Sequence, residues 1–171
     1  MAELIYPART AGDYAAFSTL VGEYIGWCRT RYRHDSGFVE QVFGHQDLDR
    51  ELRQLASAYG PPNGRTLLAR SDDVVCGAGA FRKLPDATCE MKRLYVSERF
   101  KSRGIGRRLA QALIDAARAD GFRLMRLDTA NLLTEAIGLY RKLGFRDCAP
   151  YLEYPQNLLP YLVFMEMPLG D

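Results

Sequence analysis

Residues 91–109 have the sequence MKRLYVSERFKSRGIGRRL, and this stretch decides the fold. A segment with strand character, residues 91–96, leads through a basic loop into a helix that starts at Gly104 and Gly106. The start of a helix offers unpaired backbone N–H groups at the positive end of the helix dipole. Glycines there let a ligand come close to the backbone. The stretch therefore predicts a strand, a loop and a helix that bind a diphosphate.

The charge of this stretch favours a ligand with several phosphates. Seven Lys or Arg residues lie between Lys92 and Arg108, against one acid, Glu98. Two structural explanations stay open, because glycines also occur at helix starts for packing and basic loops are often only solvated.

Two other phosphate-binding motifs fit less well. A P-loop requires Lys directly after its second glycine, and Gly106 is followed by Arg. The dinucleotide motif G-x-G-x-x-G matches Gly104 and Gly106, but Leu109 stands at the third glycine. Seven mostly polar residues also separate Val96 from Gly104, whereas that motif turns directly from strand to glycine.

Outward from this stretch, apolar periodicity and turn residues predict the remaining elements. Strands are expected at Glu3–Ala8, Arg65–Arg70, Val74–Lys83, Thr88–Val96, Phe122–Thr129, Phe145–Ala149 and Tyr161–Met167. Helices are expected from an N-cap at Asp13 to Cys28, from Asp47 to Tyr59, from Gly104 to Asp120 and from Thr134 to Leu143, with Gly121 and Gly144 ending the last two. This order predicts an α/β fold of the α+β type, with a mixed, mostly antiparallel central sheet flanked by helices.

The composition limits the class of protein to which the chain can belong. A chain of 171 residues with 47% hydrophobic and 26% charged residues fits one globular domain over 1–171. The net charge of +2 does not argue for nucleic acid. Four cysteines without a paired spacing, and histidines only at His34 and His45, predict no metal site. No export signal or membrane span is evident, so we expect no membrane partner and a cytoplasmic location.

Two segments resemble the Gcn5-related N-acetyltransferase (GNAT) family. Residues 101–106, KSRGIG, resemble its [Q/R]-x-x-G-x-[G/A] loop, and residues 136–145, AIGLYRKLGF, are similar to its A-x-x-L-Y-x-x-x-G-F segment. The match is specific from Cys89 to Arg146. Lys101 departs from the usual Gln or Arg and loses their planar geometry. Leu133 departs from the usual Asn, for which Asn131 is the expected substitute.

The resemblance implies acetyl-CoA as co-substrate, no metal, and a cofactor core at about 88–146. The backbone of the fourth strand would face the thioester and pantetheine, and the following loop would hold the pyrophosphate. The hydroxyl of Tyr140 would be catalytic and donate to the departing sulfur, although its position on an apolar stripe leaves a packing role open. The cofactor-binding residues implied are Leu94, Tyr95, Val96, Lys101, Ser102, Arg103, Gly104, Ile105, Gly106, Arg107, Asn131 and Tyr140.

A general base is expected on the fourth strand. Some members of the family carry a Glu there, and Glu90 shares a face with Lys92 and Leu94 if the strand alternates without a bulge. Alternatively, Glu90 pairs with Lys92 or Arg82 on a solvated face. Asp128 is a second carboxylate at the cleft edge, for which we expect a capping role.

The acceptor site is expected from the segments outside the cofactor core, about 12–60 and 148–167. Residues 27–34 place aromatics among Arg29, Arg31 and Arg33, which would favour an anionic acceptor. Tyr151, Glu153 and Tyr154 are lid candidates, with the alternative that both segments hold only surface and core residues. The expected reaction moves an acetyl group to a primary amine of a small metabolite in a ternary complex. Acetylation of a protein or peptide and a non-catalytic acyl-CoA sensor remain alternatives, and a homodimer stays open.

Overall fold

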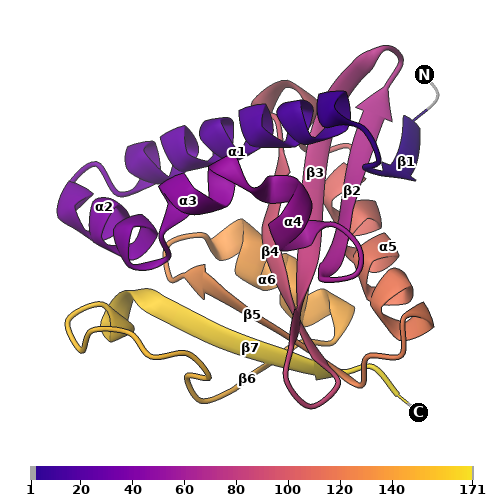
Figure 1. Ribbon diagram of the computed structural model, residues 1–171. Helices are drawn as coiled ribbons and strands as arrows, with labels where there is room; N and C mark the ends of the chain where they lie inside the picture. Colours follow the sequence, from indigo (N-terminus) through magenta and orange to yellow (C-terminus); the bar gives the residue numbers. More distant parts are fainter. Residues whose placement is uncertain (1–2, 171) are drawn as a thin grey trace.

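The computed structural model describes residues 3–170, which build a seven-stranded sheet with helices on both faces (Figure 1). The strands are β1 (Glu3–Pro7), β2 (Gly64–Ser71), β3 (Val74–Leu84), β4 (Thr88–Val96), β5 (Leu124–Ala130), β6 (Arg146–Asp147) and β7 (Leu162–Pro168). The helices are α1 (Ala11–Arg31), α2 (Ser36–His45), α3 (Leu48–Arg53), α4 (Leu55–Tyr59), α5 (Ile105–Ala119) and α6 (Thr134–Leu143), with short 3₁₀ turns η1 (Glu98–Phe100) and η2 (Leu159–Tyr161).

The strand order is β1-β2-β3-β4-β5-β7-β6. Among these strands only the β4–β5 pair is parallel, and α5 makes the connection between the two. The short turns between β2, β3 and β4 give antiparallel neighbours, as the sequence predicts. The mixed, mostly antiparallel sheet is therefore confirmed.

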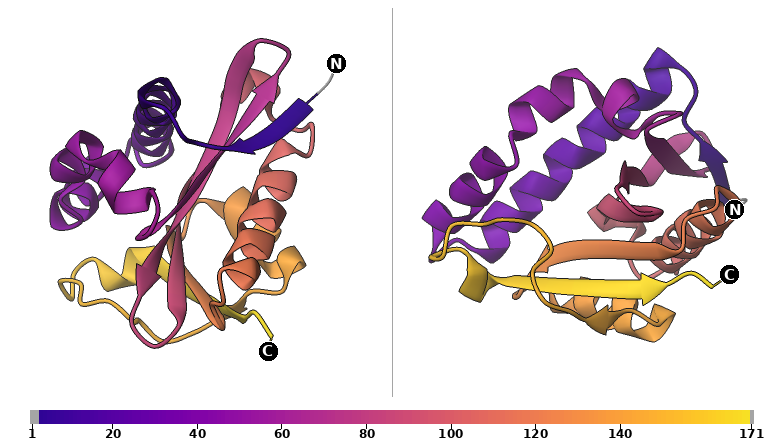
Figure 2. Two further views of the ribbon diagram at one scale, coloured as in Figure 1. Left: turned by 45° about the vertical axis from the view of Figure 1, so that its right-hand side comes forward. Right: turned by 60° about the horizontal axis from the view of Figure 1, so that its bottom comes forward.

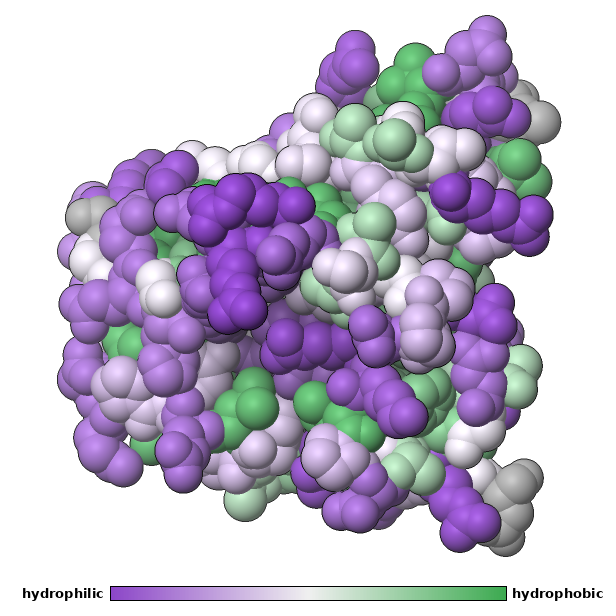
Figure 3. All heavy atoms as spheres, in the orientation of Figure 1, coloured by the Kyte–Doolittle hydropathy of each residue, from purple (hydrophilic) through white to green (hydrophobic). Residues whose placement is uncertain are grey.

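Helices cover the sheet in two layers. Figure 2 shows α1 to α4 on one face of the sheet and α5 with α6 on the other. The first layer buries Phe17 and Tyr59 against Leu68 of β2, and the second buries Leu109 and Leu113 of α5. Figure 3 shows one face of the molecule, on which hydrophilic residues predominate and apolar residues lie scattered among them. The buried apolar side chains thus pack between the sheet and the helices on each of its two faces.

Strands β4 and β5 separate soon after they meet. They pair only from Thr88 to Glu90, opposite residues 124–126, and then diverge (Figure 1). The divergence leaves one edge of β4 without a strand partner beyond Glu90 in the described chain. Backbone N–H groups on such an edge are free to bind a ligand.

A β-bulge interrupts β4 at the same place. The register with β3 shifts between Ala78 and Ala80, opposite the segment from Lys92 to Tyr95, and Arg93 has a φ of 59°. The bulge breaks the alternation of faces, so Leu94 packs on the α5 side of the sheet. The expectation that Leu94 shares a face with Glu90 and Lys92 is wrong for this reason.

The N-terminal half departs from the sequence prediction in three places. Thr10, not Asp13, caps α1: its hydroxyl accepts from the Asp13 N–H at 3.1 Å, and the Asp13 carboxylate accepts from the Thr10 N–H at 2.9 Å. Helix α2 was not predicted. The single helix expected from Asp47 to Tyr59 breaks at Gln54 into α3 and α4.

The C-terminal half follows the prediction more closely. Gly121 and Gly144 end their helices with φ of 84° and 108°, a conformation that glycine adopts without strain. Of the strand expected at Phe145–Ala149, only the two residues of β6 pair.

Candidate functional site

A groove runs along the free edge of β4, between the start of α5 and helix α6. Its lining includes Leu94, Val96, Gly104, Gly106 and Leu139. At one end of the groove lies the N-terminus of α5, whose N-cap is Gly104 with a φ of 74° and no side chain to cap the helix. The N–H groups of the first turn are therefore open to a ligand, unlike those of α1.

The groove changes character along its length. The helix end offers N–H donors, the positive dipole and the nearby side chain of Arg107, which suit a diphosphate. The remainder is walled by Leu94, Val96 and Leu139, which suit an extended, weakly polar chain. A Cβ on Gly106 would already reach contact distance of Val96 and Leu139, at 3.7 and 4.0 Å. The residues present thus fit a ligand that joins a diphosphate to a flexible arm.

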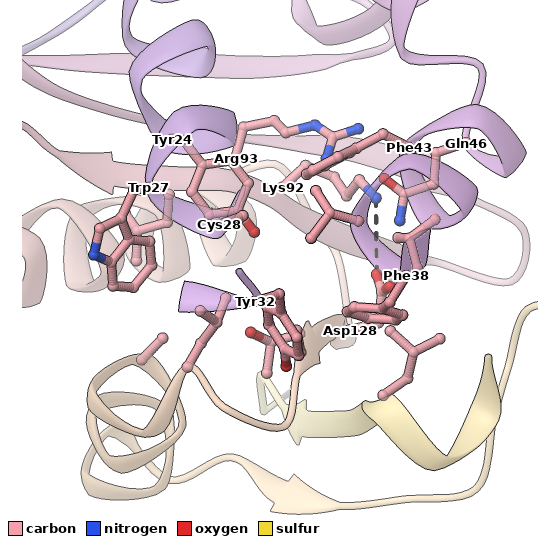
Figure 4. A pocket seen from close by; sticks show the side chains of 18 of the residues that line it. Tyr24, Trp27, Cys28, Tyr32, Phe38, Phe43, Gln46, Lys92, Arg93 and Asp128 are labelled. Carbon is pink, nitrogen blue, oxygen red and sulfur yellow. Dashed lines mark ion pairs between the residues drawn. The ribbon is translucent and has the colours of Figure 1, made fainter. Parts of the chain in front are cut away.

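A second, inner cavity of about 80 Å³ lies on the other face of the sheet, where β4 and β5 have separated. Figure 4 shows Trp27 of α1 at one end of it, and Phe38 of α2 beside Lys92 and Asp128 at the other. The groove and the inner cavity share four lining residues: Trp27, Leu94, Ala136 and Tyr140. The two spaces therefore meet at these side chains.

Tyr140 is the polar side chain at this junction. It is 7% exposed and its ring packs edge-on against Phe145 at 5.8 Å between centroids. Burial, with a smaller contribution from the charge of Asp128, raises the pKa of Tyr140 well above its ordinary value. No described residue makes a hydrogen bond with its hydroxyl. A neutral O–H donor is thus available where the two spaces join.

Comparison with known proteins agrees with this geometry. A sequence profile described as Acetyltransferase (GNAT) family matches residues 29–145. An uncharacterized N-acetyltransferase of Schizosaccharomyces pombe is 34% identical over 165 residues, which cover 92% of this chain and 90% of that protein. The chain belongs to the GNAT acetyltransferase family.

Two further similarities support the assignment. An IAA acetyltransferase of Azospirillum brasilense is 35% identical over 135 residues, 72% of this chain and 87% of that protein. An N-acetyltransferase of Thermoplasma acidophilum, solved in complex with coenzyme A, has the same fold with a TM-score of 0.68, 16% identity, and coverage of 98% of this chain and 99% of that one. GNAT proteins are acyltransferases, and acetyl-CoA is the co-substrate that the family supports.

The basic residues of the GNAT loop differ in where they point. Lys101 lines the groove, but its ammonium pairs with Glu98 and lies 4.1 Å from the ring centre of Trp27. The guanidinium of Arg103 lies over Phe100 at 5.1 Å, and Arg103 is not part of the groove lining. Ser102 and Ile105 do line it, together with Tyr95. Arg107 is thus the cation of the loop best placed at the helix end.

Asn131 is not among the residues that line the groove, so the geometry does not support its expected contact with the cofactor. Its Oδ1 accepts a 2.7 Å hydrogen bond from the Tyr32 hydroxyl, and its Nδ2 donates to the Pro160 carbonyl at 3.3 Å. Leu133, at the usual place of the family's Asn, is buried and lines the inner cavity instead.

A buried charge cluster lies behind the inner cavity. Glu90 is fully buried, 3.0 Å from an Arg82 nitrogen and 3.5 Å from Lys92 Nζ, and Lys92 Nζ is 3.7 Å from Asp128 Oδ1. Glu90 is therefore paired with both predicted cations, but in the interior and not on a solvated face. It is also absent from the cavity lining, so the geometry does not support its role as general base.

Asp128 is the carboxylate that does reach the cavity. Its side chain is 4% exposed, and its Oδ2 accepts a 2.9 Å hydrogen bond from the Tyr154 hydroxyl. It caps no helix, because α6 has Leu133 at its N-cap. Asp128 follows Leu127 of the apolar β5 pattern, and a polar residue at a strand end was the only signal in the sequence.

The cations expected in the acceptor pocket are turned away from it. Arg29 pairs with Glu40 at 2.7 Å, and Arg31 pairs with Glu135 at 2.7 Å. Arg33 donates to the neighbouring His34. From this segment Trp27, Cys28 and Tyr32 line the inner cavity. The prediction of an anionic acceptor loses its basis, because its cations do not line the cavity.

The lid candidates are held against α2. His45 Nε2 lies 2.7 Å from the carbonyl oxygen of Glu153, and Gln46 Nε2 donates to the Tyr154 hydroxyl at 2.7 Å. The Tyr151 ring packs edge-on against Phe164. This segment therefore packs against residues next to the inner cavity, but none of the three lid candidates is part of its lining. Gln46, which lines the cavity, was not singled out from the sequence, since nothing in its local pattern marks it.

Two findings concern the wider class of protein. Within residues 3–170, no group of three or more His, Cys, Asp or Glu side chains is arranged to hold a metal ion. No helix in the same range is long and apolar enough to cross a membrane.

Proposed function

We propose that this GNAT protein transfers the acetyl group of acetyl-CoA to a primary amine of a small metabolite, by direct attack in a ternary complex. The observation that carries the proposal is the meeting of groove and inner cavity at Tyr140. The groove fits the diphosphate and arm of coenzyme A, and the inner cavity approaches the same point from the opposite face of the sheet. A donor and an acceptor bound in these spaces would have their reactive ends together.

The residues of the chain have separate tasks in this proposal. Bound acetyl-CoA supplies an activated thioester carbonyl. The first turn of α5 with Arg107 binds the diphosphate, and the free backbone edge of β4 at Leu94, Tyr95 and Val96 orients the arm and donates to the carbonyl oxygen as it gains charge. As the C–N bond forms and the C–S bond breaks, Tyr140 donates its proton to the departing sulfur, and the proton that the attacking nitrogen loses restores the Tyr140 hydroxyl.

The amine is proposed to enter in its neutral form. Glu90 does not line the inner cavity, and Asp128 already accepts from Tyr154 and lies beside Lys92. The aromatic walls near the junction, formed by side chains such as Tyr24 and Trp27, favour an uncharged nitrogen there. Its volume of about 80 Å³ suits a small acceptor better than a folded peptide segment.

The test is release of free thiol from acetyl-CoA over a panel of amines, polyamines, amino acids and peptides. Small primary amines should give acceptor-dependent release. Release with peptides alone would make the chain a peptide acetyltransferase. Tight binding of acetyl-CoA in calorimetry without release for any acceptor would make it a sensor, and absence of binding by folded protein would overturn the proposal.

A further inference from the structure

Two buried oxygen atoms, each on a side chain that lines the inner cavity, have no hydrogen-bond donor among the described residues. They are Oε1 of Gln46 and Oδ1 of Asp128. Buried polar atoms in proteins are nearly always paired, and an unpaired acceptor costs free energy that a bound donor would recover. Within residues 3–170, Lys92 is a nearby cation, but its Nζ stays 3.7 Å from Asp128 Oδ1, beyond hydrogen-bond distance.

The orientation of Gln46 follows from its neighbours. The Tyr154 hydroxyl has one proton, and a carboxylate can only accept, so Tyr154 donates to Asp128 Oδ2 at 2.9 Å. The hydroxyl oxygen must then accept from Gln46, which it does from Nε2 at 2.7 Å. The amide nitrogen is thereby fixed on Tyr154, and Oε1 is left for another partner.

Both oxygens lie at the end of the cavity away from the junction. Figure 4 shows Gln46, Lys92 and Asp128 together at one end, while Trp27, which belongs to the junction, lies at the other. Aromatic side chains such as Tyr24 lie between the two ends. A ligand group that contacts Gln46 and Asp128 is therefore a part of the acceptor distant from the reacting nitrogen.

The charge at this end selects the kind of group. Two cations, Arg82 and Lys92, face two anions, Glu90 and Asp128, so the cluster is balanced. A second ammonium on the ligand would be repelled by Lys92, and a carboxylate would be repelled by the two unpaired oxygens. A neutral donor such as a hydroxyl or an amide N–H avoids both repulsions.

Building on the proposed acetylation, we infer that the acceptor carries a neutral hydrogen-bond donor at the end opposite its amine, and that Gln46 and Asp128 bind this group. Amino alcohols and amino amides are the substrate class that fits. Tyr154 is a positioning residue, since it acts by fixing the Gln46 amide and the Asp128 carboxylate.

The experiment compares acceptors of one chain length: alkylamines, amino alcohols, α,ω-diamines and amino acids. Wild-type protein should prefer the amino alcohol over the alkylamine by about tenfold in kcat/KM, the value of roughly one hydrogen bond to a buried acceptor. Diamines and amino acids should rank below the amino alcohol.

Gln46→Leu should bring the ratio of amino alcohol to alkylamine within about threefold of one, mainly through KM of the amino alcohol, with KM for acetyl-CoA unchanged. Gln41→Leu is the matched control, because Gln41 lies on α2, of which Gln46 is the C-cap, and it accepts from Asn157 away from the cavity. This control should keep the full ratio. Tyr154→Phe should reduce the ratio partly, and it serves as the second variant should Gln46→Leu not fold.

Equal use of amino alcohols and alkylamines by wild type would overturn the inference, as would a preference that survives Gln46→Leu. Either result leaves acetylation itself intact. Absence of thiol release with every amine would instead refute the proposed function, so the two failures are distinguishable.

Discussion

The guanidinium of Arg93 and the carboxylate of Glu51 form a buried pair that ties the bulge of β4 to helix α3. Arg93 Nε donates to Glu51 Oε1 at 2.9 Å and its Nη2 donates to Oε2 at 2.8 Å. The Tyr59 hydroxyl adds a third hydrogen bond to Oε1 at 2.7 Å. The pair thus joins the strand that lines both the groove and the inner cavity to the helical layer above it.

Loss of this pair should destabilise the protein. Glu51→Gln leaves Arg93 buried without a countercharge, and we expect a loss of about 3–5 kcal/mol in the free energy of unfolding. Chemical denaturation at neutral pH measures it. Glu40→Gln, which breaks the exposed pair with Arg29, is the control and should leave stability nearly unchanged, because solvent screens that pair. Equal effects of the two variants would contradict a structural role for the buried pair.

The same pair predicts acid sensitivity. Burial alone would raise the pKa of Glu51, but the hydrogen bonds and charge of Arg93 outweigh burial and lower it below the ordinary value of 4.5. A lowered pKa means stability that is present above pH 4.5 and is lost as pH falls toward the folded value. Denaturation between pH 7 and pH 3 should show a steeper loss in wild type than in Glu51→Gln, and parallel curves would contradict it.

Diphosphate binding at the start of α5 can be tested with an added negative charge, which should stabilise the helix and repel the ligand. Gly106→Asp places a carboxylate in the first turn, which favours the helix dipole, so stability should be kept or raised. The same charge should repel the diphosphate and weaken binding of coenzyme A by about 10–100-fold. Calorimetry and thermal unfolding measure the two effects. Gln111→Glu, further along α5, is the control and should leave binding unchanged. Unaltered affinity in Gly106→Asp would show that the diphosphate does not bind at the start of α5.

The parts of the fold that depend on local sequence were predictable. The strand, loop and helix of residues 91–109, the glycines that end α5 and α6, and the crossover that makes β4 and β5 parallel all follow from periodicity and turn chemistry. Helix α2 was missed although Phe38, Val39 and Val42 have helical spacing, because the exposed residues around Gly37 and Gly44 weaken the pattern.

The parts that depend on distant contacts were not predictable. The bulge at Arg93 is stabilised by Glu51, which lies 42 residues away in the sequence. The sequence of β4 itself has no signal that predicts the bulge. The sequence predicted that Glu90 pairs with cations, but its burial depends on how the whole sheet packs. The unpaired oxygen of Gln46 results from Tyr154, which is 108 residues away. Tyr140 was found only because a motif marked it.

Cys28 tests whether the acetyl group passes through the protein. The thiol lines the inner cavity, and burial raises its pKa to about 11, so little thiolate exists at neutral pH. Cys28→Ala should therefore keep turnover within about threefold, and initial rates against both substrates should give intersecting lines. Parallel lines, or a collapse of turnover in a folded Cys28→Ala protein, would instead indicate an acetylated intermediate on the enzyme.

Tyr140→Phe removes the hydroxyl at the junction and keeps the ring that packs against Phe145. The variant should fold with wild-type stability and bind coenzyme A normally, but turnover should fall by roughly 10²–10⁴. Because burial raises the pKa of Tyr140, the hydroxyl keeps its proton beyond pH 10, and wild-type kcat/KM should rise with pH as the acceptor amine becomes neutral, without a descending limb below that value. Turnover of Tyr140→Phe within threefold of wild type would leave the ring a packing role only. A descending limb near neutral pH that disappears in the variant would show that the hydroxyl ionises too early to serve as the proton donor.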